Sequence, residues 1–277
     1  MAEINKLRIA TYNIQFGINT EEIVNSIEKL ALDGVNIICI QEIINNLPQE
    51  FLVSTVLKRL GKNWQASYHV GTENSQQSIG TAIFWDTRLI KLTDEGKILL
   101  PKIKKFDLHE RFFYWVIGAV PLPKQRRTTV CYFIINNRTL RVTNLHIDNV
   151  GGPMQRMRQI TYLLSELNKL TIPDYEVICG DFNTFDLLRT GYERRLLQRK
   201  FGKAFIDASK NIGWTSDIYN IDFRKSIKLF QWIIKTFNIH IRSRLDYIWV
   251  RNLKVLDCKK VMLPGSDHYP IVADVAL

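Results

Sequence analysis

The stretch EVICGDFNT, residues 176–184, runs from an apolar strand directly into a polar turn. Val177, Ile178 and Cys179 suit a strand that is buried on both faces, as in a sheet packed between a second sheet and helices. Asp181 and Asn183 then place a carboxylate and an amide where that strand ends. Because strand ends in layered α/β proteins converge on one edge, where sites are built, this stretch predicts a layered fold with a polar site.

The same change from apolar to polar side chains recurs at other predicted strands. The polar residues at those strand ends are Asn13, Glu42, His146, Asp246, Asp267 and His268. Taken singly, each has an ordinary structural interpretation, such as a turn residue, a strand-end cap or a core histidine. Together with Asp181 and Asn183 they supply carboxylates, amides and imidazoles, which is the set of groups that a hard cation and a phosphoester require.

The remaining sequence indicates mixed α and β structure. Short runs rich in Val, Ile, Tyr and Phe suit strands. Helices are predicted over residues 20–33, 49–60 and 153–170, where apolar residues recur at helical spacing. Asn19 with Glu22 is typical of a capping box, Gly34 of a C-terminal stop and Pro153 of a first helical turn. We find no repeat and no linker rich in Gly, Ser or Pro, so residues 1–277 are interpreted as one domain.

The cysteines indicate buried, reduced thiols. Cys39, Cys131 and Cys179 lie within apolar runs, and no CxxC pair occurs. This pattern favours neither a zinc site nor a disulfide framework. The first residues contain no secretory hydrophobic region, and no apolar run approaches the roughly 18 residues that span a bilayer. We therefore expect a soluble, cytoplasmic protein.

The charge of the chain favours an anionic partner. The formal net charge is +11, and residues 186–244 carry 13 Lys or Arg against 5 Asp or Glu. Such a balance suits nucleic acid or an anionic membrane surface, and a basic but inert surface is the plain alternative. No obligate protein partner is evident from the sequence.

Within this basic segment, RKSIKLFQWIIKTF, residues 224–237, has apolar residues at helical spacing. They are Ile227, Phe230, Ile234 and Phe237. The simplest interpretation is a helix that packs its apolar side on the core. Two functional alternatives are phosphate tracking with Trp214, Tyr219 and Trp232 available for stacking on bases, and insertion of the apolar stripe into an anionic membrane interface.

Six segments resemble, in order, the motifs of the endonuclease/exonuclease/phosphatase (DNase I-like) superfamily. They are TYNIQF, IQEI, TNLHID, GDFNT, RLDYIWV and SDHYPIVADV, and the resemblance extends from residue 8 to residue 277. GDFNT and SDHYP are specific in combination, whereas TYNI alone is not. The resemblance implies an α/β fold, namely a four-layer α/β/β/α sandwich of two mixed, mainly antiparallel β-sheets.

The resemblance also implies a divalent metal, Mg²⁺ with Mn²⁺ as an alternative. Glu42 corresponds to the principal metal ligand, and Asn13 to a residue that orients it or binds the metal through water. Asp267 is expected to join that shell. The superfamily leaves open whether one metal or two are used. Mg²⁺ prefers oxygen ligands and keeps several waters, so one or two carboxylates suffice to hold it.

The catalytic assignments come from the same resemblance. His268 corresponds to the general base and Asp246 to the acceptor of its other N–H. Asp181 and Asn183 match positions that orient the attacking water and bind the phosphate or a second ion. His146 fits a histidine that contacts the phosphate or the leaving group.

Arg111 resembles a basic residue that some branches aim at the scissile phosphate. An ion pair with Glu110 is the alternative for that arginine.

These features predict a metal-dependent phosphodiesterase that acts on nucleic acid as an endonuclease or exonuclease. The alternative within the superfamily is a phospholipid or sphingomyelin phosphodiesterase, or an inositol-phosphate phosphatase, that docks on an anionic membrane through the basic amphipathic segment. A third alternative, a degenerate binding scaffold, is disfavoured because all eight polar positions are present.

Overall fold

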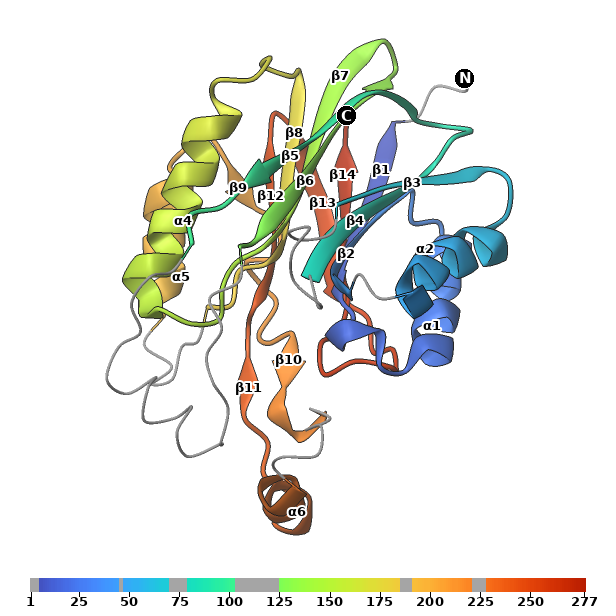
Figure 1. The fold of residues 1–277 in the computed structure, drawn as a ribbon. Helices are drawn as coiled ribbons and strands as arrows, with labels where there is room; N and C mark the ends of the chain where they lie inside the picture. Colours follow the sequence, from blue (N-terminus) through green and yellow to red (C-terminus); the bar gives the residue numbers. More distant parts are fainter. Residues whose placement is uncertain (1–4, 45–46, 70–78, 103–124, 185–190, 221–227) are drawn as a thin grey trace.

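A computed structural model describes residues 5–44, 47–69, 79–102, 125–184, 191–220 and 228–277 of the chain. Two six-stranded sheets form its centre (Figure 1). The first sheet has the order β13-β14-β1-β2-β4-β3, with β1 Lys6–Asn13, β2 Ile37–Ile44, β3 Trp64–His69, β4 Ile79–Asp86, β13 Lys254–Lys260 and β14 Ile271–Ala276. The second has the order β5-β6-β7-β8-β12-β9, with β5 Lys91–Leu99, β6 Arg127–Ile135, β7 Arg138–His146, β8 Tyr175–Asp181, β9 Ile206–Asp207 and β12 Asp246–Arg251.

Helices cover the outer face of each sheet, which gives the four predicted layers. Helices α1 Thr20–Leu32 and α2 Leu47–Leu60 lie against the first sheet, and α4 Gly152–Leu167 and α5 Tyr192–Phe201 lie against the second (Figure 1). β1 with β2 and β7 with β8 are parallel, and the other strand pairs of the two sheets are antiparallel. The prediction of a sandwich of two mixed, mainly antiparallel sheets is therefore confirmed.

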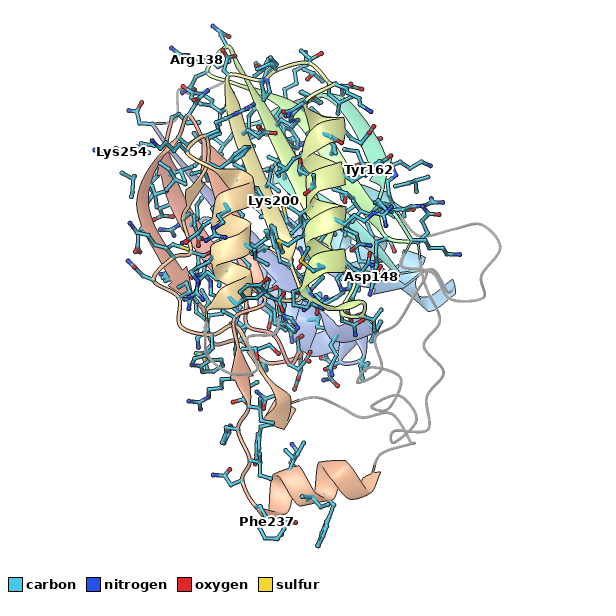
Figure 2. The ribbon with its side chains drawn as sticks, turned by 90° about the vertical axis from the view of Figure 1, so that its left-hand side faces the viewer. Arg138, Asp148, Tyr162, Lys200, Phe237 and Lys254 are labelled. Atoms are coloured by element: carbon cyan, nitrogen blue, oxygen red, sulfur yellow. The ribbon has the colours of Figure 1, made fainter. Side chains whose placement is uncertain are left out.

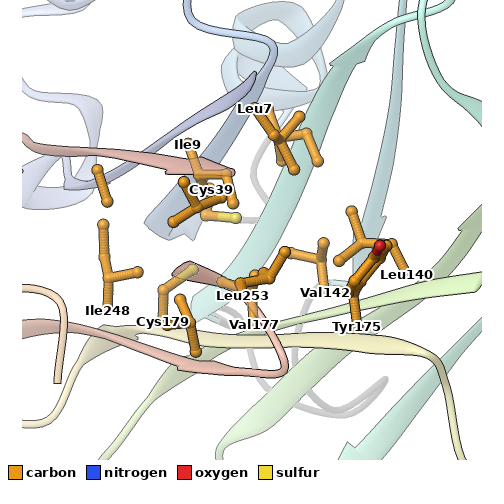
Figure 3. Packing of buried hydrophobic residues seen from close by; sticks show 14 of the residues in the cluster. Leu7, Ile9, Cys39, Leu140, Val142, Tyr175, Val177, Cys179, Ile248 and Leu253 are labelled. Carbon is orange, nitrogen blue, oxygen red and sulfur yellow. The ribbon is translucent and has the colours of Figure 1, made fainter. Parts of the chain in front are cut away.

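Three apolar clusters separate the four layers. Leu7 and Ile9 of β1 face Val177 and Cys179 of β8 in the cluster between the sheets (Figure 3). The alternate side chains of the same strands point the other way and pack against helices: Ala10 and Tyr12 belong to the cluster under α1 and α2, and Ile178 to the one under α4 and α5. This alternation explains why the central strands are apolar on both faces.

A polar layer crosses between the sheets next to this core. Gln41 Nε2 of β2 donates to Thr11 Oγ1 at 2.9 Å and to Asn144 Oδ1 of β7 at 2.6 Å. Asn144 Nδ2 in turn donates to the carbonyl oxygens of Ile40, at 2.9 Å, and Ala82, at 2.8 Å. The amide nitrogens of both residues are paired, although Gln41 Oε1 has no partner in the described part of the chain. This layer links the two sheets at one defined level.

Several local predictions can be compared with the structure. The predicted helices are present at Thr20–Leu32, Leu47–Leu60 and Gly152–Leu167, and Pro153 lies in the first turn of α4. The predicted capping box is wrong: Asn19 makes no side-chain cap, and its Nδ2 donates instead to the carbonyl oxygen of Gly265 at 3.3 Å. Cys39, Cys131, Cys179 and Cys258 are free thiols, as predicted, although Cys258 is only partly buried.

Residues 216–220 and 228–243 of the basic segment form an arm below the sandwich (Figure 1). It contains the short hairpin of β10 Ser216–Asp217 with β11 Arg242–Ser243, the 3₁₀ turn η2 Ile218–Asn220, and helix α6 Lys228–Thr236, which lies farthest from the sheets (Figure 1). The interpretation that the α6 stripe packs on the core is wrong for Phe237, which is 68% exposed. Ile234 is buried, while Ile227 and the side chain of Phe230 lie outside the described part of the chain. No helix in the ranges described is long and apolar enough to cross a bilayer.

Candidate active site

Strand register brings three of the predicted residues together on the second sheet. β7 and β8 are parallel and pair His146 with Asp181. β12 runs antiparallel to β8 and pairs Asp246 with the same Asp181. Asp181 and Asp246 follow the two-residue alternation of the core-facing positions Cys179 and Ile248, so their carboxylates lie at the end of the apolar core between the sheets.

The first sheet contributes Asn13 and Glu42. Glu42 lies at an irregularity in the β2–β4 ladder between Gln41 and Ile43, and its φ is 69°. A bulge at this point re-aims one side chain of the strand, and a non-glycine residue with such a φ is found where surrounding structure enforces it. Asn13 Nδ2 donates to Glu42 Oε1 at 3.2 Å and to Asp181 Oδ2 at 2.8 Å, so one amide joins the two sheets at the site.

The segment before β14 contributes a histidine and another carboxylate. His268 Nδ1 lies 2.8 Å from Asp246 Oδ2, and both side chains are buried. Ser266 Oγ donates to the carbonyl oxygen of Asn13 at 2.7 Å and accepts from the backbone N–H of His268 at 3.1 Å. Ser266, which the sequence analysis missed, therefore fixes this segment against β1. Asp267, between them, is 8% exposed.

Burial and mutual repulsion raise the pKa values of three acidic groups at the site. Burial, with the Asp246 carboxylate, raises the pKa of Asp181 to about 7 despite the nearby His268. Burial raises the pKa of Glu42 and of Asp267, and repulsion from Asp267 adds to the effect on Glu42. For His268, burial lowers the pKa, but attraction to Asp246 and Asp267 outweighs it, so the pKa lies well above the ordinary value.

His146 is held by a chain of buried polar groups that the sequence analysis missed. Arg126 Nη1 donates to His146 Nδ1 at 3.1 Å, and Arg126 Nε donates to Asp148 Oδ1 at 2.7 Å. Gln159 Nε2 of α4 donates to Asp148 Oδ2 at 2.8 Å. Because a guanidinium only donates, Nδ1 must accept, and the proton of the neutral ring is on Nε2.

That Nε2–H faces the carboxylates. His146 Nε2 lies 3.6 Å from Glu42 Oε1 and 3.6 Å from Asp181 Oδ2. The ring is therefore arranged to donate a hydrogen bond at the site. Arg126 directly precedes β6 in a pair of arginines, and its position at a strand start was the only available signal.

Two predicted residues remain, Asn183 and Arg111, and only Asn183 lies within the described part of the chain. Asn183 donates its backbone N–H to Asp181 Oδ1 at 2.8 Å, and its Nδ2 donates to the carbonyl oxygen of Ile147 at 2.8 Å. These bonds hold the turn after β8, in which Asn183 has a φ of 49°. Arg111 lies outside the described residues.

The residues present fit a hard divalent cation. Ligand atoms of Glu42, His146 and Asp181 all lie within 4.8 Å of one another. Within the described part of the chain, Asp246 Oδ1 is buried without a hydrogen-bond partner, and several acids share one buried region. Such a concentration of negative charge is costly unless a cation neutralises it. Because His146 Nε2 carries a proton, the carboxylates of Glu42 and Asp181 would hold the ion.

Comparison with known proteins agrees with this arrangement. The sequence profile of the endonuclease/exonuclease/phosphatase family matches residues 10–268. The chain therefore belongs to this family of phosphoester hydrolases, whose members generally use divalent metals. No curated protein sequence matches the chain.

Solved structures share the fold at low sequence identity. TDP2 of D. rerio, complexed with a single-strand DNA product, is similar with a TM-score of 0.68 at 15% identity, over 99% of this chain and 100% of that one. The catalytic domain of human Nocturnin has a TM-score of 0.62 at 19% identity, over 99% and 94%. A mannosyl-6-phosphatase of Bacteroides thetaiotaomicron has a TM-score of 0.65 at 14% identity, over 98% and 100%.

Proposed function

We propose that this protein is an Mg²⁺-dependent phosphodiesterase that acts on nucleic acid. The observation that carries the proposal is the juxtaposition, in one buried region, of the His268–Asp246 pair with the carboxylates of Glu42 and Asp181. A basic group beside a cluster of acids suits hydrolysis of an anionic ester by water. Mn²⁺ is the alternative ion.

The residues of the site divide into those that hold charge and those that move protons. A bound cation would neutralise the phosphoryl oxygens and stabilise charge that develops in the transition state. Glu42 and Asp181 would hold it, Asn13 orients both carboxylates, and we expect Asp267 to contribute from the same region.

His268 is the proposed general base. In the neutral ring, Nδ1–H donates to Asp246, which leaves Nε2 to take a proton from water. A bound cation would offset the charge of the acids that raise the pKa of His268, which favours this neutral form. The Nε2–H of His146 donates to a phosphoryl oxygen.

A basic aromatic cluster beside the site supports nucleic acid as the substrate. The Lys260 ammonium lies 2.9 Å from the centroid of the Trp214 ring, and the Arg242 guanidinium lies 4.6 Å from it. Trp214 also makes an edge contact with Tyr269, the residue next to His268. Cations interleaved with aromatic rings suit the backbone and the bases of a single strand. TDP2, in which single-strand DNA is bound, has the same fold.

The test is a substrate panel with purified protein in Mg²⁺, Mn²⁺ and EDTA. The panel contains single-stranded oligonucleotides, plasmid DNA, sphingomyelin and inositol phosphates. We expect metal-dependent cleavage of oligonucleotides, and a loss of about 100-fold or more in kcat/KM for Glu42→Ala. Glu95→Ala, on the exposed edge strand β5, is the matched control and should retain full activity. Intact DNA with a cleaved lipid would overturn the substrate assignment, and an unimpaired Glu42→Ala would overturn the metal mechanism.

One observation favours a second candidate, a phosphodiesterase of lipid headgroups. The basic arm carries exposed apolar residues at its far end, which a nuclease does not require. The sphingomyelin arm of the panel decides between the two substrates.

A further inference from the structure

The far end of the arm exposes an unusual density of large apolar side chains. Trp232 is 59% exposed, Phe237 68%, Ile239 36% and Ile241 51%, all within ten residues of chain. We call these four residues the apolar tip. Figure 2 shows Phe237 directly after α6, away from the sandwich. Exposed apolar residues scattered singly are normal, but several large ones within one short exposed segment indicate an interaction surface.

Contacts to the segment of β10 and η2 hold α6 and the residues that follow it in place. Ile234 is 2% exposed, so α6 does bury one apolar side chain. The Lys235 ammonium lies 4.7 Å from the centroid of the Tyr219 ring, and His240 stacks on the same ring at 4.5 Å. His240 Nδ1 also lies 2.7 Å from Asp217 Oδ2 of β10. These polar and aromatic contacts anchor the arm, so the exposure of the tip is a property of its folded structure.

Basic side chains outnumber acidic ones in the segment that carries the tip. Residues 224–244 contain six Lys or Arg and no Asp or Glu. Arg244 forms a buried ion pair with Asp207 at 2.7 Å, and Arg242 pairs with Asp217 at 3.1 Å, whereas Lys235 is exposed. The tip therefore combines Trp, Phe and Ile with a segment of net positive charge.

We propose that the apolar tip inserts into the interfacial region of an anionic lipid bilayer. Trp and Phe partition into the headgroup and acyl boundary, while Lys and Arg attract anionic headgroups. Nucleic acid explains the cations and the tryptophan, but it gains nothing from exposed Ile239 and Ile241, which contact hydrocarbon favourably. The inference goes beyond the proposed function, because cleavage of a phosphodiester does not require a membrane.

The experiment is sedimentation of the full chain with vesicles of phosphatidylcholine alone or with 30% phosphatidylglycerol, about the anionic content that recruits basic surfaces. Catalysis is excluded by using Glu42→Ala in EDTA throughout, so that docking is measured independently of hydrolysis. We expect binding to the anionic vesicles only, weakened by added salt. Absence of binding to anionic vesicles would overturn the inference, whatever the substrate panel shows.

Variants then separate insertion from charge attraction. Trp232→Ala with Phe237→Ala should weaken vesicle binding about tenfold or more, because apolar area is no longer buried in lipid. Leu32→Ala is the matched control, since Leu32 of α1 is 82% exposed and lies away from the arm. Equal binding by the double variant, or an equal loss in the control, would contradict insertion at the tip.

A second readout guards against misfolding of the double variant. With Glu42 intact, the Trp232→Ala, Phe237→Ala double variant should hydrolyse a soluble phosphodiester at the same rate as the unmodified chain. Its melting temperature should also be unchanged. Trp232 fluorescence, isolated by subtracting the spectrum of Trp232→Phe, should shift to shorter wavelength with anionic vesicles. An unchanged spectrum at saturating lipid would show that the tip stays in water and would refute the inference.

Discussion

At the scale of single residues, the tautomer of His146 depends on Arg126. Because the guanidinium can only donate, it makes Nδ1 an acceptor and leaves the proton on Nε2, which faces Glu42 and Asp181. Arg126 is thus a positioning residue that acts through the histidine. The ion pair with Asp148 offsets the desolvation free energy of this buried arginine.

Replacing Arg126 should change both the tautomer of the His146 ring and the rate of hydrolysis. Arg126→Met is expected to lower kcat/KM about 10- to 100-fold, the usual cost of losing such an outer partner. In ¹⁵N spectra of histidine-labelled protein, the His146 signals should move away from the Nε2–H tautomer. Arg126→Lys, which still donates, should restore part of both readouts, and Arg138→Met, an exposed position on β7, should alter neither. An unchanged tautomer in Arg126→Met would refute the positioning role.

The elevated pKa of Asp181 has a consequence for stability. The folded-state value is about 7, whereas an unfolded aspartate titrates near 3.9. The folded chain therefore retains a proton that the unfolded chain releases, so this residue's contribution to stability is lost as the pH rises from about 4 to about 7.

In metal-free buffer, urea unfolding of the unmodified chain should give a lower free energy at pH 8 than at pH 5. Asp181→Asn should remove on the order of 2 kcal/mol of that difference, because the asparagine does not ionise. Comparing the two pH values within each protein cancels the pH-independent cost of the substitution. A pH dependence in Asp181→Asn equal to that of the parent would contradict the elevated pKa.

At the scale of secondary-structure elements, the site depends on how closely β7 approaches β8. A Cβ on Gly180 would lie 2.0 Å from the carbonyl oxygen of Leu145, and the φ of Gly180 is 139°. Only glycine fits this contact, and it immediately precedes Asp181. The strand register that pairs His146 with Asp181 therefore requires glycine at this position.

Gly180→Ala should cost at least about 3 kcal/mol of unfolding free energy, since two backbones must separate. Gly96→Ala is the matched strand control: a Cβ there meets nothing within 4 Å, so the change should stay within about 0.5 kcal/mol. Urea denaturation of the two variants checks both values. Similar stability in both would show that β7 and β8 are not in such close contact.

What could be predicted from the sequence also differs between elements. The central strands were predictable because burial on both faces leaves continuous apolar runs, and the strand-end residues Asp181 and Asp246 interrupt those runs visibly. The bulge that aims Glu42 was not predictable, because it depends on pairing with β4. The exposure of α6 was missed for a related reason: periodicity identifies an apolar stripe but does not identify what covers it.

At the scale of the whole molecule, the site joins the two sheets. Asn13 and Glu42 come from the first sheet, and His146, Asp181 and Asp246 from the second. A cation held by Glu42 and Asp181 would bind only when both sheets are assembled. Binding to the folded state alone raises the free energy of unfolding by mass action.

Saturating Mg²⁺ should therefore raise the melting temperature by about 3–6 °C relative to NaCl of equal ionic strength. Glu42→Ala should abolish this increment, while Glu95→Ala should keep it. Differential scanning fluorimetry over a range of Mg²⁺ concentrations measures the effect. An equal rise in the Glu42→Ala variant would show that the ion binds elsewhere.

The polar layer of Gln41, Thr11 and Asn144 has a consequence for how the two halves find each other. If only apolar side chains lay between the sheets, one sheet could shift along the other by two residues with a small loss of stability. Such a slip would leave the buried amides of Gln41 and Asn144 without hydrogen-bond partners. Each unpaired amide would cost about 1–3 kcal/mol of stability. The layer thus allows only one alignment of the two sheets. In that alignment Asn13 lies opposite Asp181, as the site requires.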